Sequence, residues 1–286
     1  MTERMIERDG VRLCTDSFGD PADPPVILVM GMSASMLWWD EEFCRMLAAG
    51  GRLVVRYDHR DTGRSQTDQP GRPTYTGMDL VGDIARVLDA YGIGAAHVLG
   101  LSMGGGLAQV LALDHPERVA SLMLMSTSPA GPGSDLPPVT DAYGRFLASA
   151  EVDWMDAGSV AAFTVANARA LAGAERPFDE AAVRALVARD IARADRPESA
   201  QNHALVAGGE PWRHRLGDVA APTLVVHGTA DPLFPIGHGI ALAEEIPGAR
   251  LLRLEGAGHG LEAPDHATVA RAVLDHTAAA AAVSGA

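Results

Sequence analysis

The sequence has little of what several classes of protein require. Only two of its 286 residues are cysteines, Cys14 and Cys44, and they form no CxxC motif. We therefore expect two buried free thiols rather than a disulfide framework or a cysteine-based metal site. The formal net charge is −14 at pH 7. This shortage of positive charge argues against nucleic acid as a partner, because its phosphates need a basic surface.

Long apolar runs are missing as well. A membrane-spanning helix needs roughly 18 or more continuous apolar residues, and no segment of the sequence approaches that length. The N-terminal stretch MTERMIERDGVRLC also lacks the apolar core of a signal peptide. We therefore expect a cytoplasmic protein without a membrane partner.

What is present is a regular alternation of short apolar runs and helical patterns. Each run is bounded by turn residues and followed by apolar residues at three-and-four spacing. The runs are residues 26–30, 53–57, 97–101, 121–125, 223–227 and 250–254. This alternation predicts an α/β fold with a mostly parallel central sheet and helices on both faces. Continuous apolar runs fit that arrangement, because parallel strands are buried on both sides.

The middle of the chain interrupts this pattern. Between residues 128 and 217 no convincing strand occurs, and helical patterns cover 139–150, 160–172, 179–193 and 199–206. We predict a helical cap, or lid, at 128–217, inserted between two parts of one core, 1–127 and 218–286. Ligands of open α/β sheets bind beyond the carboxyl ends of the strands, so a cap placed there would cover the site.

The glycine-rich stretch GLSMGGG at residues 100–106 is the first candidate for chemistry. Gly100, Ser102 and Gly104 match G-x-S-x-G between a predicted strand and a predicted helix, the context of a nucleophile elbow. The flanking glycines leave room for the tight turn, and the helix N-terminus favours negative charge at its tip. A phosphate-binding loop fits this stretch less well, because it lacks the G-K-[ST] that such a loop requires. Gly105 and Gly106 weaken the helix, so we expect close packing of this helix against the sheet or the cap.

A serine hydroxyl needs a base, and the base needs an orienting acid. His259 lies between glycines in the loop after the strand at 250–254, and Asp231 directly follows the strand at 223–227. Three residues at three strand ends, in the order Ser102, Asp231, His259, predict a catalytic triad. Asp265 is a competing acid, but its place at a helix start is explained by capping.

The oxyanion formed on attack needs two N–H donors. We predict the backbone of Met103, which follows the nucleophile, and of Met32, in the loop after the strand at 26–30. Candidate residues for the substrate pocket share an apolar or small side chain near this edge or in the cap: they are Gly31, Trp38, Trp154 and Phe163. Neither a metal nor an organic cofactor is implied.

These motifs together resemble the α/β-hydrolase family of serine esterases with a helical lid. The resemblance is closest to the aclacinomycin methylesterase type, which removes a methyl ester from a polycyclic polyketide glycoside. The segments that carry it are VMGM, RYDHRDTGRS, HVLGLSMGG, LALDH, PTLVVHGTADP and GAGH. It implies the same roles for Ser102, His259 and Asp231, and the same oxyanion donors, Met32 and Met103. We expect residues 60–65 to be structural, holding the loop after a strand.

The function predicted is therefore that of a serine hydrolase that cleaves carboxylic esters through an acyl-enzyme, with a small-molecule ester as its partner. The same triad also supports perhydrolysis, lactone opening or C–C bond hydrolysis. A small-molecule receptor built on a hydrolase scaffold is a further alternative. The oligomeric state is left open between a monomer and a homodimer.

Overall fold

A computed structural model describes residues 3–129, 135–206 and 209–284. Its centre is an eight-stranded sheet in the order β1-β2-β4-β3-β5-β6-β7-β8. From β4 to β8 every neighbouring pair is parallel, whereas β1–β2 and β2–β4 are antiparallel. The strands are β1 (Arg4–Arg8), β2 (Val11–Phe18), β3 (Pro25–Val29), β4 (Leu53–Tyr57), β5 (Ala96–Leu101), β6 (Val119–Met125), β7 (Thr223–Gly228) and β8 (Arg250–Leu254). The mostly parallel sheet is confirmed, and the six predicted strands are all present.

The two strands that the apolar runs did not reveal form the N-terminal hairpin. β1 buries only Ile6 and carries charged residues at three of its five positions, so it offers no apolar run. A different signal marks the turn. Asp9 and Gly10 both have positive φ, 52° and 75°, as a two-residue hairpin turn with Asp-Gly requires.

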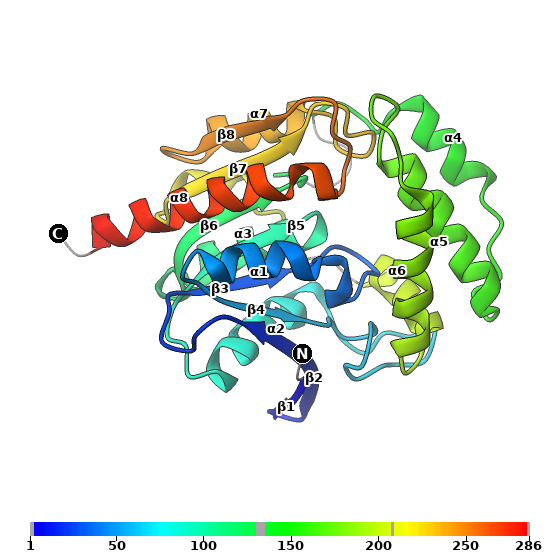
Figure 1. The fold of residues 1–286 in the computed structure, drawn as a ribbon, viewed down its shortest axis with the longest axis horizontal. Coiled ribbons are helices and arrows are strands. Elements are labelled where there is room, and N and C mark those ends of the chain that lie inside the picture. The colour runs from blue at the N-terminus through cyan, green and yellow to red at the C-terminus, as the bar shows by residue number, and fades with distance from the viewer. Residues whose placement is uncertain (1–2, 130–134, 207–208, 285–286) are drawn as a thin grey trace.

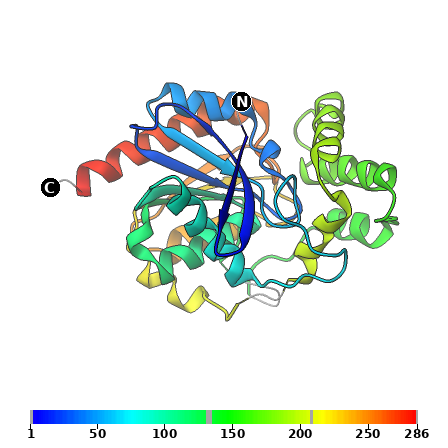
Figure 2. The ribbon, with the colours of Figure 1, turned by 90° about the horizontal axis from the view of Figure 1, so that it is seen from below.

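Helices cover both faces of the sheet (Figures 1 and 2). On one face lie α1 (Glu41–Ala49) and α8 (His266–Ser284), and on the other lie α2 (Gly77–Ala90), α3 (Met103–Asp114) and α7 (Gly237–Glu245). Two separate apolar clusters fill these interfaces, one packing α2, α3 and α7 and the other packing α1 and α8. None of the described helices combines the length and apolarity needed to cross a membrane. Cys14 and Cys44 are buried free thiols, as expected, and burial raises the pKa of each to about 12.

Three further helices, α4 (Asp141–Ser149), α5 (Ala157–Leu171) and α6 (Glu180–Arg193), lie together beside one end of the sheet, at the right of Figure 1. They match three of the four helical patterns expected there. The fourth, at 199–206, is instead a 3-10 segment, η3 (Pro197–Leu205). Its side chains explain the difference, because Ser199 and Asn202 are buried and bond to core backbone rather than forming an amphipathic α-helix. The division of the chain at 128 and 217 stays a prediction, and residues 130–134 and 207–208 lie outside the described residues.

Candidate active site

Ser102 occupies a strained turn between β5 and α3. Its φ of 55° and ψ of −120° are angles that a residue with a side chain adopts only when its surroundings impose them. A Cβ at Gly100 would lie 2.3 Å from the Gly104 carbonyl oxygen, and a Cβ at Gly104 would lie 2.2 Å from the Val29 carbonyl oxygen. Only glycine fits at either position, so the sequence folds here into a turn that holds Ser102 out from the backbone.

The structure brings Ser102 together with both of its predicted partners. Ser102 Oγ lies 2.9 Å from His259 Nε2, and His259 Nδ1 lies 2.8 Å from Asp231 Oδ2. Because an ionised carboxylate only accepts, Nδ1 carries the ring proton and Nε2 is left to accept from the serine hydroxyl. The histidine is 5% exposed and the aspartate 2%, so the link between His259 and Asp231 is shielded from water.

Asp231 is held through both carboxylate oxygens. Oδ1 accepts the backbone N–H groups of Leu233 and Phe234, each at 2.9 Å. Burial by itself would raise the pKa of Asp231, but the charge and hydrogen bond of His259, the nearby His227 and the Phe234 N–H outweigh it and hold the pKa below its usual value. The carboxylate is therefore ionised at neutral pH and available to orient the imidazole.

A second histidine lies beside the acid. His227 Nε2 is 2.7 Å from the Phe234 carbonyl oxygen and 3.6 Å from Asp231 Oδ2. Burial lowers the pKa of His227, so the ring is neutral and donates to the Phe234 carbonyl. It ties the end of β7 to the loop that carries Asp231, in keeping with a structural role.

The loop after β3 lies against the nucleophile. A Cβ built on Gly31 would lie 3.3 Å from Ser102 Cβ, and Met32, next in the chain, has a half-exposed side chain. Ser33 follows in a left-handed conformation, with a φ of 61°. The loop thus brings its backbone close to the position where an ester carbonyl would meet Ser102.

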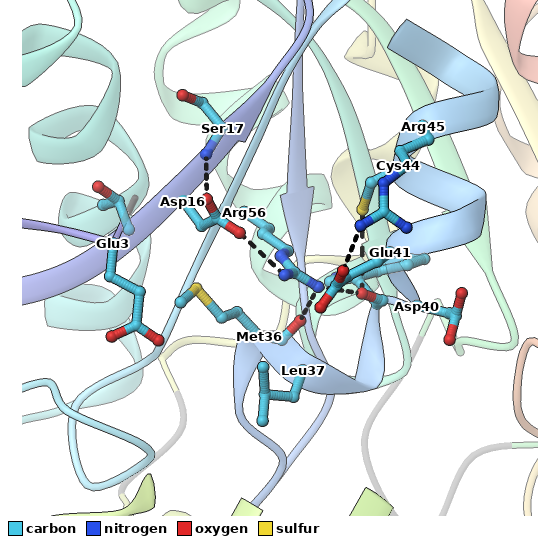
Figure 3. A network of polar contacts seen from close by, with 12 residues as sticks. Glu3, Asp16, Ser17, Met36, Leu37, Asp40, Glu41, Cys44, Arg45 and Arg56 are labelled. Atoms are coloured by element: carbon cyan, nitrogen blue, oxygen red, sulfur yellow. Dashed lines mark hydrogen bonds and ion pairs between the residues drawn. The ribbon is translucent and has the colours of Figure 1, made fainter. Parts of the chain in front are cut away.

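A buried arginine fastens the segment that follows this loop. Arg56, on β4, donates to the carbonyl oxygens of Met36 and Trp39 and forms an ion pair of 2.9 Å with Asp16 on β2. Figure 3 shows the guanidinium between Asp16 and the Met36 carbonyl. Because Arg56 and Asp16 are both fully buried, the pair anchors the exit of the loop to two strands.

The predicted pocket residues do not form one cluster. Trp38 donates from Nε1 to Asp190 on α6, at 2.8 Å. Trp154 and Phe163 instead pack edge to face at α5, with ring centroids 5.5 Å apart. An aromatic ring beside the triad is that of Phe234, whose centroid lies 5.5 Å from that of His259. Sequence reasoning missed Phe234, although it lies only three residues after Asp231.

Residues 58–65 form a dense polar network outside the triad. Arg60 makes a bidentate ion pair with Asp83 on α2, at 2.7 and 2.8 Å. Asp61 accepts from the Tyr75 hydroxyl at 2.7 Å and from Asn202 Nδ2 at 2.9 Å. These contacts join the loop after β4 to α2 and to η3, as expected of a structural segment.

Among the described residues, one group brings three metal-ligating atoms within 4.8 Å of one another: Asp40, Glu42 and His266. Asp40 caps α1 by accepting the Glu42 N–H, and the His266 ring lies 5.8 Å from Phe43. Capping and ring packing account for two of these side chains, and none of the three belongs to the Ser102 cluster.

Comparison with known proteins gives consistent matches. A family model described as alpha/beta hydrolase fold matches residues 24–261. The chain is 34% identical to the rhodomycin D methylesterase DauP of Streptomyces sp. (strain C5), over 98% of this chain and 99% of that protein. Among solved structures it is similar to the esterase RhEst1 from Rhodococcus sp. ECU1013, with 26% identity, a TM-score of 0.78 and coverage of 96% of this chain and 98% of that one. It is also similar to Est816, described as an N-acyl homoserine lactone degrading enzyme, with 30% identity, a TM-score of 0.67 and coverage of 90% and 93%.

Proposed function

This chain belongs to the α/β-hydrolase family, and we propose that within it the chain is a serine esterase with Ser102 as nucleophile, His259 as base and Asp231 as orienting acid. The observation that carries the proposal is the continuous chain of hydrogen bonds from Ser102 Oγ through His259 to Asp231, with links of 2.9 and 2.8 Å. The similarity to proteins named as esterases supports carboxylic esters as the substrate class.

The reaction follows from the tautomer of His259. Ser102 Oγ attacks the ester carbonyl while Nε2 takes the hydroxyl proton, and Asp231 stabilises the imidazolium that forms. His259 then protonates the departing alcohol, which leaves an acyl group on Ser102. In the second half of the reaction, His259 removes a proton from water, and the resulting attack releases the acid and restores the serine.

We assign the oxyanion donors to two backbone N–H groups. Met103 is the first residue of α3, where N–H groups without helical partners and the helix dipole both favour negative charge. Met32 lies in the loop whose Gly31 packs against Ser102. Together they would bind the oxygen of the tetrahedral intermediate from two sides.

For the substrate we propose a methyl ester on a bulky polyketide-type acid. The support is the full-length similarity to a protein named rhodomycin D methylesterase. A methyl ester places nearly all of the substrate on the acyl side of the scissile bond. The Phe234 ring at His259 and the aromatic residues of the cap supply apolar surface for a ring system of that kind.

A second candidate reaction is lactone opening. The 30% identity to Est816 supports it, and the chemistry is the same attack on an ester carbonyl, with the alcohol remaining attached to the product. A lactone has no separate leaving alcohol, so product analysis distinguishes the two reactions.

The test is a panel of esters that varies the acyl and alcohol groups independently. We expect hydrolysis of p-nitrophenyl acetate and butyrate, and a higher kcat/KM for methyl esters of polycyclic acids than for methyl butyrate. Ser102→Ala should abolish turnover of every substrate. Turnover that survives in this variant would refute the proposed nucleophile, and a preference for acyl homoserine lactones over all the methyl esters would replace the proposed substrate class.

A further inference from the structure

The loop that carries the proposed oxyanion donor Met32 is held from the cap side by a histidine with no role in the triad. The Ser33 backbone N–H donates to His203 Nδ1 at 2.9 Å. His203 Nε2 in turn lies 2.7 Å from the Arg60 carbonyl oxygen. A single buried ring, 3% exposed, therefore connects the loop after β3 to the loop after β4.

Further contacts fix the same loop around this bond. Ser33 Oγ donates to the Ala200 carbonyl oxygen at 2.7 Å, and His59 Nε2 donates to the Met30 carbonyl oxygen at 2.9 Å. Met30 and Ser33 are thus bonded on either side of Gly31 and Met32. The orientation of the Met32 N–H depends on these flanking anchors, because Ser33 is kept in a left-handed conformation that a free serine adopts only at a cost.

The segment that carries His203 is itself fastened to the core. Asn202 donates to Asp61 and to the Gln69 carbonyl oxygen, and Ser199 donates to the Asp68 carbonyl oxygen. η3 therefore presents His203 from a fixed base. The ring also packs edge to face against His59, with centroids 5.8 Å apart.

The two partners of His203 define its tautomer. A backbone N–H only donates, so Nδ1 must accept; a carbonyl oxygen only accepts, so Nε2 must carry the proton. Burial and the neighbouring His59 lower the pKa of His203 to about 4, which keeps the ring neutral near neutral pH. An imidazolium would place an N–H against the Ser33 N–H and break the anchor.

We propose that His203 is a positioning residue that aims the Met32 N–H at the ester oxyanion by accepting the hydrogen bond of Ser33. This inference rests on the proposed esterase function. It assigns to η3 a direct part in the geometry of the oxyanion hole. A residue that only filled space between cap and core would not depend on which ring nitrogen kept its partner.

Two substitutions test the roles of the two ring nitrogens of His203 separately. In His203→Asn the amide oxygen takes the place of Nδ1 and keeps an acceptor for Ser33. In His203→Gln the amide nitrogen takes the place of Nε2, which keeps the donor to Arg60 but removes the acceptor. The matched control is His276→Gln. His276 is equally buried. Its Nε2 donates to the Pro222 carbonyl oxygen at 3.1 Å, and its Nδ1 accepts from Arg250 at 3.4 Å. Pro222 lies before β7, at the end of the strand opposite Asp231, so this histidine is far from the site.

The measurements are kcat and KM with p-nitrophenyl butyrate and the affinity for a trifluoromethyl ketone, which forms an oxyanion on the serine. Loss of a whole oxyanion donor lowers kcat by about 10²–10³, so turning the Met32 N–H away from the oxyanion should lower kcat by about tenfold or more. We expect His203→Gln to lose that factor in kcat and in ketone affinity with little change in KM. His203→Asn should stay within about threefold of wild type, and His276→Gln within about twofold.

Wild-type kinetics in His203→Gln would overturn the inference. So would equal losses in the Asn and Gln variants with ketone affinity unchanged, the result expected of a space-filling role. Should His203→Gln fail to fold, His203→Ala replaces it. The alanine removes both ring nitrogens, and comparison with His203→Asn, which lacks only the donor to Arg60, isolates the loss of the acceptor. The proposed function is judged separately, by wild-type turnover and its loss in Ser102→Ala.

Discussion

Asp231 holds a buried negative charge through contacts from four residues, two backbone N–H groups and two imidazole rings. Oδ1 accepts two backbone N–H groups, and Oδ2 faces His259 and, more distantly, His227. This arrangement makes the carboxylate an orienter of His259 rather than a proton donor, because its pKa is held below the usual value. Its effect on catalysis should therefore come through the tautomer of the imidazole.

Replacing Asp231 by Asn tests that role. An amide favours the wrong imidazole tautomer, so kcat/KM for p-nitrophenyl butyrate should fall by about 10³–10⁴. Asp265, the competing acid of the sequence, pairs with Arg176 instead, at 2.5 Å. Asp265→Asn is the control and should keep kcat within about threefold; equal losses in both variants would mean that the orienting acid is misassigned.

Which residues could be predicted from the sequence depends on how local their signal is. Ser102, Asp231 and His259 each follow a recognisable strand in a short glycine-containing motif, so their meeting at one sheet edge was predictable. Ser33 and His203 are 170 residues apart, and their bond depends on how η3 packs against the loop after β3. No local pattern encodes that contact, and the same holds for Trp38 with Asp190.

At the scale of elements, α3 carries two glycines whose environments differ. A Cβ at Gly105 would lie 2.6 Å from Thr127 Cβ, whereas the nearest atom to a Cβ at Gly106 would be Trp212 Cζ2, at 3.6 Å. The close packing expected for both is therefore required only at Gly105. Thr127 also donates to the Ser102 carbonyl oxygen at 2.7 Å, which couples this packing to the elbow.

The two glycines should respond oppositely to alanine. Gly106→Ala should raise the free energy of unfolding by about 0.5–1 kcal/mol, because it improves helix propensity without a clash. Gly105→Ala should lower it by about 1–3 kcal/mol through overpacking against Thr127, and should also reduce kcat. Urea unfolding measures both, and a stabilising Gly105→Ala would show that the helix does not rest on Thr127.

Helix α6 is joined to the loop after β4 by a buried ion pair. Arg193, at the end of α6, lies 2.7 Å from Asp58, whose side chain is fully buried. Burial raises the pKa of Asp58, and the hydrogen bond and charge of Arg193 partly offset that increase. The pair therefore neutralises a carboxylate that no longer contacts water.

Breaking this pair should be costly. Arg193→Ala leaves a buried carboxylate without its cation, and we expect a loss of about 3–5 kcal/mol in the free energy of unfolding. Arg184→Ala, which removes an exposed pair with Glu180, should cost less than about 0.5 kcal/mol. Similar small values for both variants would mean that α6 is not anchored through Asp58.

At the scale of the whole molecule, buried histidines link stability to pH. His59, His97 and His203 have pKa values lowered to about 4 by burial, with the charge of Arg52 adding to the effect on His97 and the neighbouring His59 adding to the effect on His203. Their folded pKa lies below the ordinary value of 6.5, so between pH 6.5 and 4 the unfolded chain binds more protons than the folded one. The contribution of these groups to the free energy of unfolding is fully present above pH 6.5, and it is lost as the pH falls from 6.5 towards 4.

When the pH falls from 7.5 to 5, protonation of each of these imidazoles in the unfolded chain should lower the free energy of unfolding by about 1–2 kcal/mol. His97 should lie at the lower end of that range, because solvent partly screens it. His97 bonds to Ser121 within the sheet, apart from the triad. His97→Asn should therefore reduce the pH dependence of the unfolding free energy by about that amount. Identical pH profiles for wild type and variant would contradict the assignment.

The overall architecture was predictable because most of its strands are buried and apolar, whereas residues 128–217 were predictable only as helices. Apolar runs identify six of the eight strands, and the order of motifs along the chain places the site at their carboxyl ends. The sequence did not predict the hairpin β1–β2, because β1 is mostly polar and its structure depends on the turn residues. It did not predict the 3-10 geometry of η3 either, because that geometry depends on side chains that bond to distant backbone.

The central claim is that Ser102 is the nucleophile, activated by His259, and one labelling measurement tests it most directly. The protein is treated with an alkyl fluorophosphonate, and the intact mass and the modified peptide are determined. We predict one phosphonyl group per chain, located on Ser102, absent in Ser102→Ala and formed at least about 10³-fold more slowly in His259→Ala. Modification of another residue, or an unchanged rate without His259, would contradict the account.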